Sequence, residues 1–192
     1  MRIEECKVYL ENPSDKKAPE KQFVFDSAYD GNSSNESIYG DICYSLVESV
    51  LEGYNSTIFA YGQTGCGKSH TMQGPVLSKL VDGQEIDTRS HQSSKNNGII
   101  SNAFDHLFEA ISVAHDIRYL VVVSYLEIYN ETIRDLLNND TQNNLKLKEN
   151  PTEGVLVENL SRHPVQNVAE CEQLLLYGAK NRKVGATLMN GG

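Results

Sequence analysis

The chain of 192 residues has no tryptophan, no long apolar run and no bias towards a single residue type. Its longest apolar stretches, such as Tyr119–Ser124, are far shorter than the roughly 20 residues that span a bilayer, so we expect no membrane partner. The start, Met1–Glu5, lacks the apolar core of a signal peptide. The composition is 39% hydrophobic and 22% charged, which excludes collagen-like, disulfide-rich and low-complexity classes. These absences indicate a soluble, globular protein of the cytoplasm.

Basic residues and paired cysteines are also scarce. Seventeen Lys and Arg against 26 Asp and Glu give a net charge of −9. Nucleic-acid binding needs a net-positive face to contact phosphates, so we expect no nucleic-acid partner. The cysteines, Cys6, Cys43, Cys66 and Cys171, include no CxxC pair, and no histidine cluster stands at zinc spacing. This pattern indicates reduced thiols rather than a zinc site or a disulfide framework.

What the chain does have is an alternation of strand and helix patterns. The patterns predict strands at 7–10, 22–26, 57–61 and 119–129, and helices at 35–51, from 68, at 100–115 and at 168–189, with a short helical turn at 131–137. Residues 145–148 and 154–157 predict a small hairpin, and the polar stretch 74–97 predicts a long loop. We therefore predict an α/β fold with a mainly parallel central sheet, flanking helices and a β-hairpin excursion.

One motif carries specific chemistry, and it lies directly after the predicted strand 57–61. The motif G-x-x-x-x-G-K-[ST] of the P-loop is matched by Gly62, Gln63, Thr64, Gly65, Cys66, Gly67, Lys68 and Ser69. Its glycines let successive N–H groups converge on phosphate oxygens, and the following helix points its positive end at them. Lys68 would reach the β- and γ-phosphates, and the Ser69 hydroxyl would coordinate Mg²⁺. Chance could produce the pattern, but the strand before it and the helix after it favour nucleotide binding. With this motif, the predicted α/β fold is of the P-loop NTPase type.

The residues that would complete a hydrolytic site are not apparent in the sequence. Hydrolysis by P-loop enzymes uses an aspartate at the end of an apolar strand for Mg²⁺, and a group that positions water. No run of four apolar residues ends in Asp. Glu127 could serve as a magnesium ligand or base, but we interpret it as a charged residue on one face of a long strand. The sequence therefore offers a phosphate cradle, and we assign no catalytic residue.

The run Leu51–Met72, with Phe59-Ala60-Tyr61 before the P-loop and Gln63-Thr64 inside it, resembles the kinesin motor domain. Further matches follow in family order at Phe25-Asp26, Tyr39, Gly98–Ile100, Ser124–Glu131, Ile133–Leu137, Asn181-Arg182 and Val184–Asn190. Together these matches cover almost the whole chain. Residues 145–157 and the closing Thr187–Asn190 are most similar to the ciliary, kinesin-two type, in its homodimeric branch.

The resemblance implies an ATP-driven motor that moves along microtubules, with ATP and Mg²⁺ as cofactors held by residues 62–69. His70 corresponds to a position that lines the adenine pocket in some members; the alternative is a solvent-facing histidine in the first turn of a helix. The segment 74–97 corresponds to the variable loop five of the family. The resemblance places the protein in the cytoplasm on the cytoskeleton, and its ciliary type adds the cilium or flagellum.

The predicted hairpin corresponds to loop eight of the family, which is a secondary microtubule contact. Lys146 and Lys148 are the candidate contacts there. Glu149 and Glu153 would oppose an acidic tubulin surface, so a solvated hairpin face is the alternative interpretation.

The sequence also departs from the family pattern. It lacks the Arg-x-Arg-Pro strand that stacks on adenine, both switch motifs and the main microtubule-binding helices. We therefore expect residues 1–192 to be a partial motor domain, truncated at both ends, that binds nucleotide weakly and does not hydrolyse it alone. Any dimer would form through regions outside this chain. The alternative is a non-motor interaction module that binds tubulin or a partner protein; an unrelated P-loop kinase or GTPase would need motifs that are absent.

Overall fold

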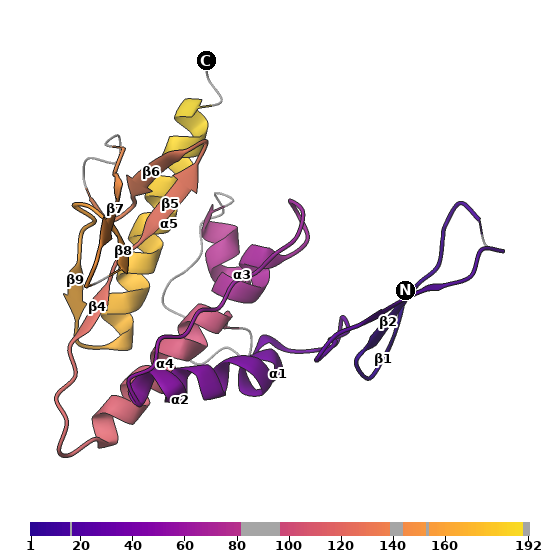
Figure 1. Cartoon of the computed structure of the whole chain (residues 1–192), viewed down its shortest axis with the longest axis horizontal. Coiled ribbons are helices and arrows are strands. Elements are labelled where there is room, and N and C mark those ends of the chain that lie inside the picture. The colour runs from indigo at the N-terminus through magenta and orange to yellow at the C-terminus, as the bar shows by residue number, and fades with distance from the viewer. Residues whose placement is uncertain (16, 82–96, 139–143, 153, 190–192) are drawn as a thin grey trace.

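The chain begins with a small antiparallel sheet that stands apart from the helices (Figure 1). The structure is a computed structural model that describes residues 1–15, 17–81, 97–138, 144–152 and 154–189. The sheet has the order β1-β2-β3, formed by β1 (Arg2–Glu4), β2 (Lys7–Leu10) and β3 (Lys21–Val24). Its register places Ile3, Val8 and Phe23 in one cross-strand row. The predicted strands at 7–10 and 22–26 are thus confirmed, but they lie outside the main core.

A continuous helical segment follows, as predicted over 35–51. It consists of α1 (Asn35–Ile38), the π-helical turn η1 (Tyr39–Cys43) and α2 (Tyr44–Leu51). Ser34 caps its start by accepting the backbone N–H of Ser37 at 3.1 Å. Gly53 ends the segment with a φ of 102°, the left-handed conformation that glycine adopts at low cost after a helix. The extra π turn is the one feature of this segment that apolar spacing does not predict.

Two further helices, α3 (Lys68–Val81) and α4 (Ile99–Val113), pack against each other. The backbone of α3 is non-helical at Gly74, where φ is 81°. Gly98 caps α4, and a Cβ atom built on Gly98 would overlap the backbone of Met72, Gln73 and Gly74. Only glycine therefore allows α4 to begin at this point against α3. The predicted loop 74–97 is wrong over its first part, because α3 continues past the kink at Gly74 to Val81. Residues 82–96 of the predicted loop lie outside the described residues.

The helical part has its own hydrophobic core. Tyr39, Cys43, Val47 and Ile99 are buried, and Ile38, Ile58, Met72 and Ala103 pack on them. A polar network adds to this core: the Tyr39 hydroxyl lies 2.8 Å from Nδ1 of His106, and Nε2 of His106 lies 2.8 Å from a Glu48 carboxylate oxygen. Burial raises the pKa of Tyr39 to about 12 and also raises the pKa of the Cys43 thiol. The network fastens the segment 35–51 to α4.

The second half of the chain is built from short strands and one long helix. Its elements are β4 (Val121–Val123), β5 (Leu126–Tyr129), β6 (Thr132–Asp135), β7 (Leu147–Asn150), β8 (Gly154–Val157), β9 (His163–Val165) and α5 (Val168–Met189). β4 pairs with β9, β5 with β6 and β7 with β8. The hairpin β7–β8 and the final helix confirm the predictions for these regions. No helix in the described part of the chain has the length and apolarity needed to cross a bilayer.

A second group of buried residues joins these strands to α5. Its members are Ile133, Leu136, Leu137, Val165, Cys171, Leu175 and Ala179. The carboxylate of Asp135, which is also buried, accepts the backbone N–H groups of Leu137 at 2.9 Å and Ser161 at 2.7 Å. A Cβ atom on Gly178 of α5 would overlap the Tyr125 ring. Asn181 of α5 also donates a hydrogen bond to the Leu136 carbonyl at 2.7 Å, so this half of the chain packs on α5 through both apolar and hydrogen-bonded contacts.

Two local predictions in this half are wrong. The predicted helical turn at 131–137 is the strand β6, because Asn130 and Glu131 have φ values of 48° and 61° and form a tight two-residue hairpin turn. The predicted long strand at 119–129 is two short strands, β4 and β5, separated at Ser124 and Tyr125. The break arises because the two pieces have different partners.

The predicted strand 57–61 is wrong for the described residues: the segment is stretched out between α2 and α3 (Figure 1), but it forms no strand and pairs with none. Phe59 is 83% exposed and Tyr61 is 95% exposed. All the strand pairs of the described residues are antiparallel, so the predicted mainly parallel central sheet is not formed by them. A strand becomes part of a sheet only when a neighbour supplies the matching hydrogen bonds, and segment 57–61 has no such neighbour here.

Candidate nucleotide-binding site

The P-loop is a tight turn between the extended segment 57–61 and α3. Its glycines Gly62, Gly65 and Gly67 have φ values of 154°, 81° and 98°, a region that L side chains rarely adopt. The backbone N–H of Cys66 bonds to the carbonyl oxygen of Gln63 at 3.3 Å. A glycine-rich turn of this kind can direct backbone N–H groups towards one concave side, where an anion can bind.

The two ends of the loop approach each other closely. A Cβ atom on Gly62 would overlap the sulfur atom of Cys66, whereas Gly65 and Gly67 have open space where a Cβ would stand. The Cys66 sulfur ends a side chain that can rotate away, so the backbone conformation of Gly62 is what favours glycine at this position. Cys66 is a small, exposed residue that the turn accommodates.

Lys68 places its charge directly over the loop. Its ammonium group donates hydrogen bonds to the carbonyl oxygens of Gly62 and Gln63, both at 2.7 Å. Lys68 is half-buried, while Ser69 and His70 are exposed in the first turn of α3. The N–H of Thr71 bonds to the Gly67 carbonyl at 3.0 Å, which fixes the start of the helix. The turn thus combines the Lys68 ammonium, the exposed Ser69 hydroxyl and the N-terminus of α3.

These groups fit a phosphate-bearing nucleotide with its magnesium ion. The glycine turn leaves the space that an approaching phosphate requires, and the ammonium and N–H groups are donors of the kind that anionic oxygens accept. The Ser69 hydroxyl is a hard oxygen ligand, which Mg²⁺ prefers. The described residues contain no group of three or more His, Cys, Asp or Glu that could hold a metal ion. Ser69 therefore stays the one metal ligand that we predict among them.

Comparison with known proteins settles the family. A family model described as "Kinesin motor domain" matches residues 3–192. The chain belongs to this family. It is 46% identical over 173 residues to kinesin-like protein klp-20 of Caenorhabditis elegans. The aligned region covers 90% of this chain and 24% of klp-20. It is 42% identical to kinesin-like protein KIF3C of Pongo abelii over an alignment of 193 residues. This alignment covers 99% of the chain and 22% of KIF3C.

Membership of the kinesin motor domain family confirms the resemblance that the sequence motifs predict, and it implies the P-loop nucleotide-hydrolase fold. The order of extended segment, glycine turn and helix over 57–81 agrees with this fold. The chain spans less than a quarter of the length of each of these two relatives.

One residue at the site of this kinesin-family chain was not predicted. Asn35, at the start of α1, is only 7% exposed, and its side-chain amide donates to the carbonyl oxygen of His70 at 3.2 Å. In the sequence, Asn35 stands at the start of the predicted helix 35–51, a position that suits an ordinary helix-capping residue. Its contact with the P-loop helix joins residues 35 positions apart, so no local pattern indicates it.

Glu127 is engaged in ion pairs rather than free for chemistry. Its carboxylate oxygens lie 2.6 Å from Arg134 and 3.5 Å from Arg182, and its side chain is only 16% exposed. Two guanidinium groups on one carboxylate stabilise the contact between the hairpin β5–β6 and α5. This arrangement agrees with the interpretation of Glu127 as a structural charge on a strand face.

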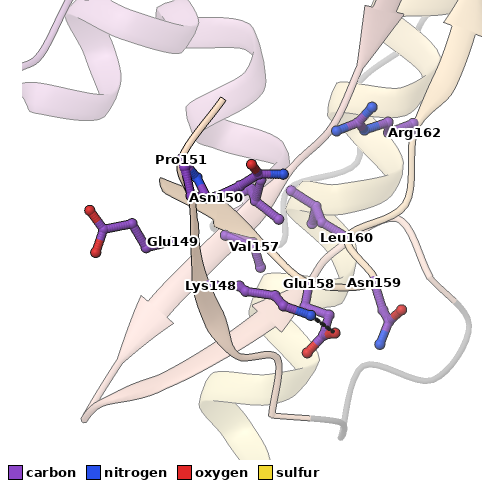
Figure 2. A pocket seen from close by; sticks show the side chains of 10 residues that line it. Lys148, Glu149, Asn150, Pro151, Val157, Glu158, Asn159, Leu160 and Arg162 are labelled. Atoms are coloured by element: carbon purple, nitrogen blue, oxygen red, sulfur yellow. Dashed lines mark hydrogen bonds and ion pairs between the residues drawn. The ribbon is translucent and has the colours of Figure 1, made fainter. Parts of the chain in front are cut away.

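The two candidate microtubule contacts, Lys146 and Lys148, lie on the hairpin, away from the P-loop in sequence. The Lys148 ammonium pairs with Glu158 at 3.2 Å, and the backbone carbonyl of Lys146 accepts the N–H of Glu158 at 2.8 Å. Figure 2 shows Lys148 and Glu158 beside a cavity of about 570 Å³ that Arg162 also lines. One of the two lysine charges is therefore already paired within the hairpin region.

Proposed function

We propose that this chain is the ATP-binding portion of a microtubule motor. The observation that carries the proposal is the Lys68 ammonium held over a turn of three left-handed glycines in a chain of the kinesin family. In this proposal the turn of residues 62–69 binds the phosphates, and His70 lines the adenine pocket. Ser69 would hold Mg²⁺, which when bound neutralises phosphate charge.

The roles of the residues follow from their groups. The N–H groups of the turn orient the phosphate oxygens, and Lys68 exchanges its two carbonyl partners for phosphate oxygens, whose negative charge makes stronger hydrogen bonds. The exposed positions of Ser69 and His70 leave both side chains free to meet a ligand. The N-terminus of α3 carries a partial positive charge, which further stabilises the bound phosphates.

We further propose that this chain alone does not hydrolyse ATP at a microtubule-stimulated rate. Supporting this, Glu127 is occupied by two arginines and no described carboxylate cluster could hold a metal ion. The test is steady-state ATPase of the 192-residue chain with and without microtubules. We expect the same basal rate in both, and clear stimulation by microtubules would contradict the proposal.

For the whole protein we propose the remaining family properties. Its partner would be the microtubule, with Lys146 and Lys148 as contacts. The protein would be of the kinesin-two type and would lie on the cytoskeleton of the cytoplasm or cilium. Any dimer would form through regions outside this chain. Segment 57–61 would be a strand of a mainly parallel central sheet. Its β-branched and aromatic composition and its extended, unpaired backbone support this assignment.

A second candidate function is an interaction module that binds tubulin or a partner protein. The exposed side chains of Phe59 and Tyr61 beside an unpaired extended backbone favour it, because such a segment can add to another sheet. The test is size-exclusion chromatography with light scattering of the chain alone and with tubulin. If this function is correct, the chain is expected to associate with itself or with tubulin. A monomer that does not bind tubulin would contradict it.

A further inference from the structure

Asn35 is one of the few buried polar residues of the described chain, together with Ser101 and Asp135. A buried amide that lacks partners costs free energy, so the bond from its Nδ2 to the His70 carbonyl at 3.2 Å offsets a real penalty. The acceptor belongs to the residue directly after Ser69. The bond therefore reaches the same turn of α3 that carries the phosphate-binding groups.

The side chain of Asn35 is mounted on a well-fixed support. It is the first residue of α1, behind the cap formed by Ser34 and Ser37. From there the chain runs into the buried residues Tyr39 and Cys43, which lie in the core of the helical part. The hydrophobic core therefore fixes the position of the Asn35 amide, and the amide in consequence fixes the first turn of α3.

We propose that Asn35 is a positioning residue for the P-loop, which holds Lys68 and Ser69 in their binding geometry through the His70 carbonyl. The inference rests on the proposed nucleotide-binding function of the loop. It does not place Asn35 against the nucleotide. The first turn of α3 begins at the bond between the Thr71 N–H and the Gly67 carbonyl, so a helix start that is free to shift would open this bond more often.

The test substitution is Asn35→Leu, which keeps the approximate volume and removes the donor. We expect affinity for MgADP, measured by titration calorimetry on the 192-residue chain, to fall about tenfold. Asn35→Gln keeps an amide donor on a longer stem and is expected to retain most of the affinity. Asn102→Leu, the same change on α4, is the matched control and should leave the affinity unchanged.

A second measurement separates positioning from general loss of stability. The Thr71 N–H bonds to Gly67 at 3.0 Å and the Asn102 N–H bonds to Gly98 at 3.1 Å, so each amide reports the first turn of its own helix. In Asn35→Leu we expect hydrogen exchange at Thr71 to become about tenfold faster while exchange at Asn102 stays the same. Equal acceleration at both amides, or none at Thr71, would overturn the inference.

The two proposals fail in different ways. If the unaltered chain does not bind MgADP, the nucleotide-binding proposal fails, while the exchange comparison between Thr71 and Asn102 still decides the role of Asn35. If the unaltered chain binds MgADP and Asn35→Leu binds it equally well, only the role of Asn35 is rejected.

Discussion

Replacing Lys68 by alanine is expected to weaken MgATP binding by at least about a hundredfold, because charge-assisted hydrogen bonds to phosphate are the strongest polar contacts that the loop offers. The ammonium already lies over the turn, held by the carbonyls of Gly62 and Gln63 at 2.7 Å. Binding therefore needs no large movement of the side chain. Titration of the variant with MgATP by calorimetry measures the loss.

Lys7→Ala is the matched control for this experiment. Lys7 is an exposed lysine of β2, in the sheet that stands apart from the helices, so its loss removes the same charge without touching the loop (Figure 1). We expect its affinity for MgATP to equal that of the unaltered chain. Equal affinities in Lys68→Ala and Lys7→Ala would contradict the assignment of Lys68 as the phosphate-binding lysine.

The change Gly98→Ala is expected to destabilise the chain by about 2–4 kcal/mol, the cost of forcing an added methyl group into a closely packed contact. The added Cβ would overlap backbone atoms of Met72, Gln73 and Gly74. Backbone cannot move aside as a flexible side chain does, so α3 and α4 must separate. Urea unfolding followed by circular dichroism measures the free energy of unfolding.

Gly40→Ala makes the same chemical change where the expected result has the opposite sign. Gly40 lies inside η1, and a Cβ there meets nothing within 4 Å. Glycine inside a helix is less favourable than alanine by about 0.5–1 kcal/mol, so this variant is expected to be slightly more stable. A Gly98→Ala variant as stable as Gly40→Ala would show that the packing of α4 on α3 is loose.

The features that the sequence predicts correctly are set by local patterns. The apolar spacing over 35–51 and 100–115 gives two helices close to their observed bounds. The P-loop motif is also local, since eight consecutive residues determine its glycine turn and its lysine. The hairpin at 145–157 follows in the same way from two short strands around a turn.

The features that the sequence does not predict depend on distant partners. Residues 131–137 have apolar spacing that suits a helix or a strand, and the left-handed turn at Asn130 and Glu131 selects the strand by pairing it with β5. Asn35 gains its role only through the carbonyl of His70. Strand formation at 57–61 likewise depends on a neighbour that its own residues cannot specify.

Segment 57–61 has no paired strand in the part of the chain that the structure describes, so other contacts hold the phosphate site rigid there. Upstream of the loop, the chain is held by Ile58 in the helical core and by the bond from the Ser56 hydroxyl to the Leu46 carbonyl at 3.2 Å. Downstream, α3 is held by Asn35 and by the close contact at Gly98. Among the described residues, the loop is therefore held by helical contacts on both sides. The order of the phosphate cradle therefore begins with the helical core, and the central-sheet pairing proposed for segment 57–61 would add to a loop that the helices already hold.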